Sequence, residues 1–326
     1  MTTHTPGARA ELVWITNPDN YDPGLGARLK REGSERVDLY VEHGFDVRVV
    51  HSCDVVPGWN SGPRLWHGDE DLLCKGRGFL LSSWTWHQGI AQQIQAIART
   101  IRASDAVLLT DGVHGAEGLA MDKLAMYHHA GRLDVPVLPC VAVPFGRYTR
   151  RALETVRREL AADAPHGYVI KPREMAMGFG VHRVDTLEQL SSALDLLAPA
   201  DLGCLVQPCL PHTGDVRVYV HQGRQLAALL RTPEAGAYRA NVSQGGSGSA
   251  LTVPAEITEM SERLARSVDA DYLCVDWLLG ADGPVFNEWM TVSAAFEDLP
   301  EPERSTVGRA LVTHLARRLG VGGTEA

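Results

Sequence analysis

Strand and helix patterns alternate along almost the whole chain, and this alternation limits the fold class more than any single motif does. Residues 11–17 and 45–50 carry the apolar runs of β-strands, and residues 26–44 between them are compatible with a helix. A strand–helix–strand start followed by further alternation is typical of α/β proteins. The sequence therefore predicts an α/β fold.

The remaining patterns extend this alternation to residue 320. Residues 53–87 fit neither period and hold Trp59, Trp66, Trp84 and Trp86 among glycines and prolines, so we expect a long ordered loop or flap. Packing and ligand binding are equally open roles for these tryptophans. We expect helices over residues 90–103, 121–133, 148–163, 185–198, 255–269 and 305–320, strands over 106–110, 136–143, 167–172, 204–208, 272–279 and 284–290, and a hairpin over 215–231.

Composition argues against several classes of protein. The 326 residues are 44% hydrophobic and 22% charged, as in globular domains, and no apolar run reaches the roughly 18 to 20 residues that span a bilayer. The start lacks a secretory signal pattern, so we expect a cytoplasmic protein without membrane contact. A net charge of -9 without a Lys/Arg-rich run argues against nucleic acid and favours a small-molecule partner. The six cysteines form no C-x-x-C pair, so we expect reduced structural thiols.

A lysine and a glycine-rich loop form the first candidate for an anion site. The G-x-x-x-x-G-K-[ST] loop and a complete G-x-G-x-x-G are both missing, so a nucleotide site must be built in another way. Lys171 ends the apolar strand YVIKP, and residues 177–180 (MGFG) follow it. A strand-end ammonium and the backbone N–H groups of a Gly-x-Gly loop can bind one phosphate together. A surface lysine beside a plain hairpin turn is the alternative.

Arginines and one acid mark the hairpin over residues 215–231. Asp215, Arg217 and Tyr219 share one face of its first strand, because side chains alternate along a strand. The returning strand ends at Arg231, and Arg239 follows shortly after. Three arginines near one carboxylate suit the charge that develops on a transferred phosphoryl group. A solvated ladder of ion pairs is the alternative.

Two acids stand on neighbouring strands that a tight turn joins. Asp276 lies in CVDWLL and Glu288 in VFNEWMT, so the two carboxylates should lie within reach of each other. Two inward carboxylates repel unless a cation lies between them, and Mg²⁺ prefers such oxygen ligands. Strand alternation places Glu288 on one face with Phe286 and Met290. Asn287 should then face the opposite way. An acid solvated at a strand edge is the alternative.

Taken in order along the chain, these elements resemble the ATP-grasp superfamily. Within it, the chain is similar to the ribosomal-protein-S6 glutamate ligase and the amino-group-carrier ligase of lysine biosynthesis. The resemblance implies an ATP-grasp fold of α/β class with α+β character, in which a pre-ATP-grasp domain precedes two α+β subdomains that sandwich ATP. The implied units are residues 1–115, a central subdomain at 116–205 with the glycine-rich lid, a carboxy-terminal subdomain at 206–320 with the metal site, and a frayed tail at 321–326.

The resemblance also implies roles for single residues at the nucleotide. Lys123 and Lys171 correspond to the lysines that contact the ATP phosphates. Gln207 and Pro208 fall on the hinge that contacts adenine, with Gln207 at a position where glutamate is usual. The mobile phosphate lid corresponds to Gly178, Phe179 and Gly180.

Further residues are implied for chemistry and for metal binding. The arginines that stabilise an acyl phosphate correspond to Arg217 and Arg231, together with Arg239, which also contacts the nucleotide. The other implied nucleotide contacts are Asp215 and Asn241. The implied metal ligands are Asp276 and Glu288, with Met290 where a third ligand, asparagine, is usual.

The implied activity is that of an ATP-dependent carboxylate–amine ligase. Such an enzyme forms an amide or peptide bond between small amino-acid-like substrates through an acyl phosphate and releases ADP and phosphate. ATP and Mg²⁺ are the expected cofactors, with Mn²⁺ as an alternative ion. A dipeptide or γ-glutamyl ligase of a specialised biosynthetic pathway is the specific expectation. A carboxylate–thiol ligase, a small-molecule kinase and a non-catalytic ATP-binding module are the alternatives, and a homo-oligomer is left open.

Overall fold

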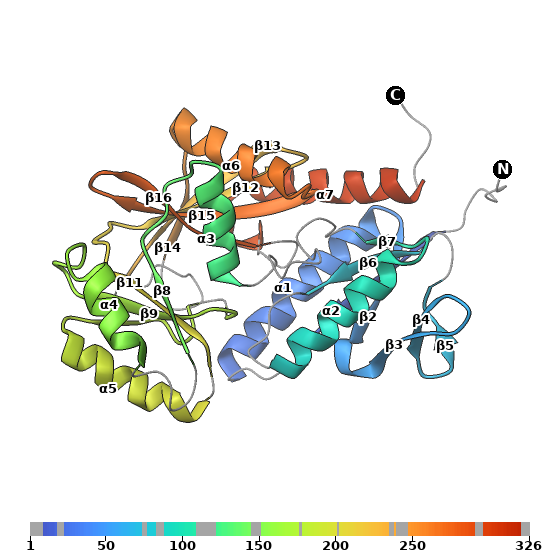
Figure 1. Ribbon diagram of the computed structural model, residues 1–326. Coiled ribbons are helices and arrows are strands. Elements are labelled where there is room, and N and C mark those ends of the chain that lie inside the picture. The colour runs from blue at the N-terminus through green and yellow to red at the C-terminus, as the bar shows by residue number, and fades with distance from the viewer. Residues whose placement is uncertain are drawn as a thin grey trace.

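The computed structural model describes residues 9–17, 23–73, 77–82, 88–108, 122–144, 151–175, 178–200, 202–234, 238, 247–290 and 296–320. Within these ranges the chain forms four β-sheets with helices packed against them (Figure 1). No helix in the same ranges is both long and apolar enough to cross a bilayer.

A parallel sheet organises the amino-terminal part of the chain. Its elements are β1 (Ala10–Thr16), α1 (Pro23–Glu42), β2 (Phe45–His51), β6 (Gly78–Leu81), α2 (Gln88–Arg102) and β7 (Val107–Leu108). The strand order is β2-β1-β6-β7, and every neighbouring pair is parallel. Ile97 and Ile101 of α2, one helical turn apart, are buried in the core of this sheet. The α/β start predicted from the sequence is confirmed.

Residues 53–87 are not the irregular loop that the sequence predicted. They contain β6 and, before it, a small antiparallel sheet of β3 (Val55–Trp59), β4 (Pro63–His67) and β5 (Glu70–Asp71). Glycines and prolines interrupt these short strands and hide their period. Trp66 packs so closely over Gly58 that a Cβ there would lie 2.6 Å from its ring, whereas Trp59 is exposed. Trp84 and Trp86 lie outside the described residues.

The central part of the chain is an antiparallel sheet with two helices. Its elements are β8 (Val141–Val143), α4 (Leu153–Leu160), β9 (Tyr168–Pro172), β10 (His182–Val184), α5 (Leu187–Leu197) and β11 (Cys204–Pro208). The strand order is β10-β9-β11-β8. Strand β8 is shorter than predicted, because Pro136 and Pro139 lack the N–H that a ladder requires. Helix α4 begins later than predicted, and residues 145–150 lie outside the description.

A second antiparallel sheet forms the carboxy-terminal part. Its strands are β12 (Asp215–His221), β13 (Arg224–Thr232), β14 (Ser247–Ala250), β15 (Tyr272–Gly280) and β16 (Gly283–Met290), in the order β14-β13-β12-β15-β16. The flanking helices are α3 (Lys123–Arg132), α6 (Ala255–Ser267) and α7 (Glu303–Leu319). The predicted hairpin is confirmed, with Asp215 paired to Arg231 across it.

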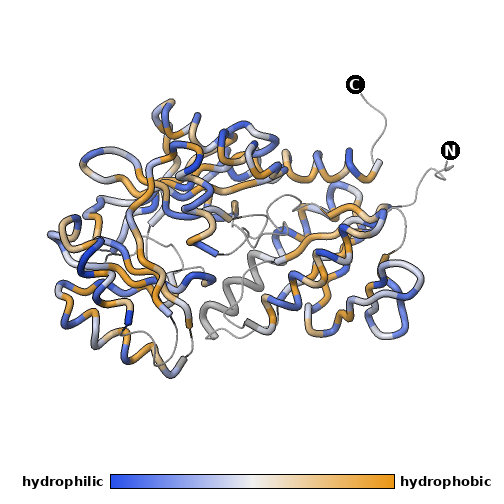
Figure 2. The backbone as a smooth tube through the Cα atoms, viewed as in Figure 1, coloured by the Kyte–Doolittle hydropathy of each residue, from blue (hydrophilic) through white to orange (hydrophobic). Residues whose placement is uncertain are grey.

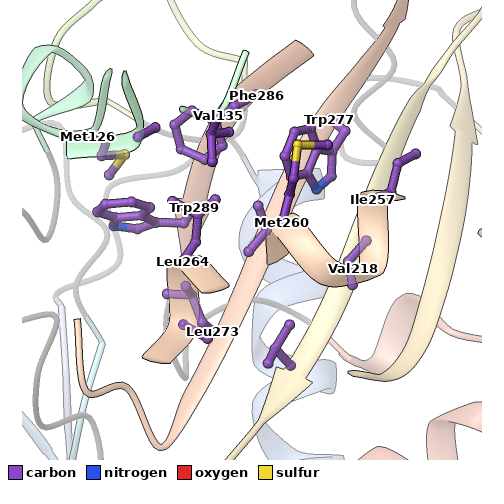
Figure 3. Packing of buried hydrophobic residues seen from close by; sticks show 14 of the residues in the cluster. Met126, Val135, Val218, Ile257, Met260, Leu264, Leu273, Trp277, Phe286 and Trp289 are labelled. Carbon is purple, nitrogen blue, oxygen red and sulfur yellow. The ribbon is translucent and has the colours of Figure 1, made fainter. Parts of the chain in front are cut away.

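Each face of this carboxy-terminal sheet has its own core. Trp277, Phe286 and Trp289 pack with residues of α3 and α6 on one face (Figure 3). The other face packs against α7 and against Trp14 and Tyr40 of the amino-terminal part. Apolar and polar residues alternate along the covering helices (Figure 2), as expected for helices that bury one side. The carboxy-terminal sheet is therefore enclosed on both faces, with room left for a site beside the central sheet.

Candidate active site

A pocket opens between the central sheet and the carboxy-terminal sheet. The space between its walls, which includes solvent at its open mouth, is about 720 Å³. Strands β9 and β11 supply one wall, and strands β12, β13 and β16 supply residues of the facing wall. The lining includes these residues that the sequence had singled out: Lys123, Lys171, Gly178, Phe179, Gln207, Pro208, Asp215, Arg231 and Glu288.

The other predicted site residues lie beside the pocket or outside the description. Arg217 and Asp276 are buried without lining it. Gly180 has a φ of 70°, and a Cβ there would lie 2.6 Å from Pro172, so this end of the loop requires glycine. Arg239 and Asn241 lie outside the described residues.

Lys171 is held inside the pocket by two neutral acceptors. Its Nζ donates to the hydroxyl of Tyr127 and, at 3.1 Å, to Oδ1 of Asn287. The side chain is buried, and burial lowers the pKa of Lys171 to about 7, with Glu288 opposing this shift and Lys123 adding to it. An ammonium in such a site gains most when an anion arrives, because few charges offset its burial.

Lys123 stands at the amino end of α3, close to the start of the glycine-rich loop. Asp122 caps this helix by accepting from the backbone N–H of Leu124, and its carboxylate also binds the guanidinium of Arg173. The Nζ of Lys123 lies 3.3 Å from Oε2 of Glu288 and donates to the carbonyl of Met175. The helix start thus brings one lysine to the acidic strand β16.

Asp276 is neutralised by two arginines. Nε and Nη2 of Arg217 each donate to one of its carboxylate oxygens at 2.8 Å, and Nη2 of Arg231 donates at 2.7 Å. Burial acts to raise the pKa of Asp276, but the two guanidinium groups outweigh it and lower the pKa to about 2. Arg231 also binds Asp215. The arginines therefore converge on Asp276 more than on Asp215, and they remove the repulsion that seemed to demand a cation between the acids.

Strand β16 does not alternate as the sequence predicted. Asp276 pairs with Glu288 but Trp277 pairs with Phe286, so Asn287 is an extra residue in a β-bulge. The bulge brings Asn287 and Glu288, two consecutive residues, into the pocket. Phe286 instead faces the core on the opposite side of the sheet, where Figure 3 shows it near Trp289. The expectation that Phe286 shares the face of Glu288, and that Asn287 points away, was wrong.

Met290 belongs to an apolar cluster. It is paired across the sheet with Cys274 and packs among the residues between this sheet and α7. Within the described residues, no group of three or more His, Cys, Asp or Glu side chains could hold a metal ion. The donors nonetheless fit Mg²⁺, because this ion uses one or two carboxylates together with ligand phosphates and water. Glu288 offers one carboxylate in the pocket, and Asp276 lies opposite it.

A buried amide fits the base of a nucleotide. Among the residues that the structure describes, the buried Nε2 of Gln207 has no hydrogen-bond partner, although Oε1 accepts from the hydroxyl of Tyr127 at 3.4 Å. Such a donor requires an acceptor, and a purine ring nitrogen supplies one. Sequence reasoning missed Tyr127 and misplaced Asn287. The available signals were a tyrosine one helical turn after Lys123 and a polar residue directly before Glu288 in an apolar strand.

Comparison with known proteins supports the domain and the relatives expected from the motifs. The family model for the ATP-grasp domain of prokaryotic glutathione synthetase matches residues 149–281. A probable alpha-L-glutamate ligase of Parasynechococcus marenigrum is 26% identical over 154 residues, which are 47% of this chain and 33% of that protein. A second one, of Alcanivorax borkumensis, is 30% identical over 122 residues, which are 37% of this chain and 40% of that protein. The chain thus spans less than half the length of these two relatives.

Solved structures resemble the chain over nearly its whole length. The D-cycloserine synthetase DcsG has a TM-score of 0.70 at 16% identity and covers 95% of this chain and 99% of its own. A D-alanine–D-alanine ligase from Bacillus anthracis, solved with ATP, has a TM-score of 0.67 at 12% identity and covers 96% and 99%. The architecture and the matched domain agree: residues 149–281 match an ATP-grasp domain, and the chain has the ATP-grasp fold that its motifs predicted.

Proposed function

We propose that this protein is an ATP-dependent ligase that joins a carboxylate to an amine. Its substrates would be small and amino-acid-like, an acyl phosphate would be the intermediate, and ADP and phosphate would be released. One observation carries the proposal. Two buried lysines and Arg231 share a pocket with the carboxylates of Asp215 and Glu288, which suits a triphosphate and its cation. The names of the glutamate-ligase relatives support amide formation as the reaction.

Each pocket residue has a role in this proposal. Lys123 and Lys171 bind the phosphates, and the Nε2 of Gln207 donates to the base. The lid with Gly178 and Phe179 closes over the phosphates and excludes water, which protects an acyl phosphate from hydrolysis. Arg231 stabilises charge on the transferred group. Arg239 and Asn241 remain proposed contacts of the triphosphate.

Arg217 takes a different role from the one first expected. Both of its donated bonds end on Asp276, and it does not line the pocket. We therefore assign it to positioning Asp276 rather than to contact with the acyl phosphate. Mg²⁺, or Mn²⁺ in its place, would offset negative charge on the phosphates, held by Glu288 and Asp276.

The proposed reaction needs no side-chain nucleophile. The substrate carboxylate attacks the γ-phosphorus of ATP, and the bond to ADP breaks. The amine then attacks the acyl carbon, phosphate leaves, and a proton is lost from nitrogen. Orientation and charge neutralisation suffice for the first step, which the lysines and Arg231 can provide. A dipeptide or γ-glutamyl ligase remains the specific version of the proposal.

Several other expectations from the sequence remain predictions. They are a cytoplasmic location, a partner that is neither nucleic acid nor membrane, an open oligomeric state, and domain boundaries at residues 115, 205 and 320. The sheets fall at residues 10–108, 141–208 and 215–290, so the proposed boundary at residue 205 lies within strand β11 (Cys204–Pro208).

A matrix of amino-acid pairs tests the proposed activity. Purified protein is incubated with ATP, Mg²⁺ and each pair, and released phosphate and product mass are measured. We expect at least one pair to release phosphate in step with an amide product. Phosphate transfer without any need for an amine would favour a kinase, and a thioester product would favour a thiol ligase. Release no greater than that of the protein alone with every pair would contradict catalysis and favour a nucleotide-binding module.

A further inference from the structure

A chain of hydrogen bonds runs through the wall of the pocket. Asn287 of β16 accepts from Lys171 of β9, Lys171 donates to Tyr127 of α3, and Tyr127 donates to Gln207 of β11. The four side chains come from four elements that lie far apart in the sequence. This series of hydrogen bonds begins on β16, next to Glu288, and ends at Gln207, whose Nε2 is buried without a partner among the described residues.

Three of the four side chains are protected from water, and Asn287 is half-buried. Tyr127 is 4% exposed, Lys171 5% and Gln207 2%. The ring of Tyr127 is fixed by an edge-to-face contact with Phe286, with centroids 6.0 Å apart. The bulge in β16 places Phe286 in the core, where it contacts Tyr127, and places Asn287 in the pocket. Both acceptors of Lys171 are therefore positioned by this bulge.

The two hydrogen bonds of Lys171 do not use all the N–H donors of its ammonium group. A lysine ammonium carries three N–H donors and no acceptor. Tyr127 takes one donor of Lys171 and Asn287 takes a second. Both acceptors are neutral, so they orient the ammonium without cancelling its charge. With Tyr127 and Asn287 as its acceptors among the described residues, Lys171 keeps one N–H donor for an anionic ligand.

We infer that Tyr127 and Asn287 are positioning residues that hold Lys171 in the orientation needed for a nucleotide phosphate. Tyr127 has a second role, because its hydroxyl also orients the amide of Gln207 toward the base. The hydroxyl of Tyr127 thereby connects Lys171, which contacts the phosphates, with Gln207, which contacts the base. This inference rests on the proposed function only in requiring that the pocket bind a nucleotide.

Calorimetric titration of ADP without metal tests the inference independently of any ligase activity. Tyr127→Phe and Asn287→Leu each remove one acceptor of Lys171 and nearly preserve shape. We expect each to weaken ADP binding about tenfold, as loss of one hydrogen bond to a charged group does. In a Lys171→Met background, Asn287→Leu should change the affinity less than about twofold, because the group that it positions is gone.

Adenosine separates the two ends of the pocket. Adenosine has no phosphate, so Asn287→Leu should leave its affinity unchanged within about twofold. Tyr127→Phe should weaken adenosine binding as well, because Gln207 loses its partner. Tyr168→Phe is the matched control, since Tyr168 is buried on the same strand as Lys171 without lining the pocket, and it should alter neither affinity.

The outcomes that overturn the inference are distinct from those that overturn the proposed function. Equal effects of Asn287→Leu with and without Lys171 would show a merely structural role. Unchanged ADP affinity in both single variants would also refute the positioning role. Asn287→Ser, which is too short to reach Lys171, replaces the leucine variant if that one fails to fold. Failure of the unaltered protein to bind any adenine nucleotide would refute the proposed function itself.

Discussion

Asp276 shows how strongly this site depends on charges held inside the protein. Asp276 is 1% exposed, and its partners Arg217 and Arg231 are 4% and 3% exposed. Removing one partner from a buried charge network leaves the others without compensation, which commonly costs about 3 to 5 kcal/mol. The carboxylate therefore stabilises the fold in addition to any role toward a cation.

Asp276→Asn should lower the free energy of unfolding by about 3 kcal/mol, because it leaves two buried guanidinium groups facing a neutral amide. Urea denaturation measures the change. Asp282→Asn, at an exposed turn of the same hairpin, is the control and should change stability by less than about 0.5 kcal/mol. A loss at Asp276 as small as that of the control would show that the network contributes little.

Glu288→Gln should reduce ADP formation by about a hundredfold or more, because the pocket loses the carboxylate that faces Lys123 and the proposed cation. Met290→Asn should keep ADP formation but lower the melting temperature, since it places an amide in an apolar cluster. Turnover and thermal melts of both variants provide the measurement. Near-normal turnover of Glu288→Gln would remove the basis for the metal assignment.

Regular elements were predictable from the sequence, whereas irregular ones were not. Strands β9 and β11 lie within or match their predicted ranges, because an apolar run bounded by turn residues defines a buried strand locally. The bulge at Asn287 was missed, because pairing of β15 with β16 decides it and not the period of either strand. The small sheet at residues 55–71 was missed because its strands are short and rich in glycine and proline.

The junction of β12 with α7 should make stability depend on pH. Burial, together with His314 and Arg317 of α7, lowers the pKa of His221 to about 4, while Asp271 just before β15 opposes this shift. His221 and His314 pack edge to face with centroids 5.1 Å apart. The folded pKa lies below the unfolded value near 6.5, so the neutral form of His221 is the one that the fold favours.

Stability from His221 is therefore complete above about pH 6.5 and is lost as the pH falls toward 4, by up to about 3 kcal/mol. His221→Gln should flatten this part of the profile without changing the trend due to carboxylates below it. Denaturant unfolding of both proteins at pH 7, 5.5 and 4.5 provides the comparison. Parallel profiles would show that His221 is not the group responsible.

At the scale of the whole molecule, the amino-terminal and carboxy-terminal parts share one of their apolar clusters, and the central sheet has a separate one. Trp14, Tyr219 and Leu315 belong to a single apolar cluster, although they come from β1, β12 and α7. The core of the central sheet contains residues of α4, α5 and β8 to β11. This division was not predictable, because both parts carry ordinary strand and helix patterns.

A buried ion pair joins the amino-terminal and carboxy-terminal parts of the protein. Nε and Nη2 of Arg36 each donate to Glu297 at 2.8 Å, and its guanidinium lies 5.3 Å from the ring centres of Trp14 and Phe296. Arg36→Met should destabilise the protein by about 3 kcal/mol by leaving Glu297 buried alone. Adding Glu297→Leu should recover most of this loss. Denaturation experiments on the single and double variants measure these changes. A double variant less stable than either single variant would contradict the proposed effect of leaving Glu297 unpaired.

The site itself was predicted by residue type better than by position. Lys171, Asp215, Arg231 and Glu288 line the pocket as expected, because each begins, ends or interrupts an apolar strand in a way that packing does not explain, whereas Lys123 was expected only from the family resemblance. The partner of Arg217 was not predicted, because the sequence does not show which of two nearby acids an arginine on a strand binds. Tyr127 was missed because a tyrosine on a helix face is most often part of a core.

The bulge at Asn287 has a consequence for how such a pocket can change over evolutionary time. Removing Asn287 would leave Glu288 opposite Asp276 and Phe286 opposite Trp277, as they are now. The pocket would lose one amide, and every other side chain would keep its orientation. This protein's pocket can thus gain or lose a ligand-facing group through insertion or deletion of a single codon, a route that leaves every existing contact of the strand to its neighbour intact.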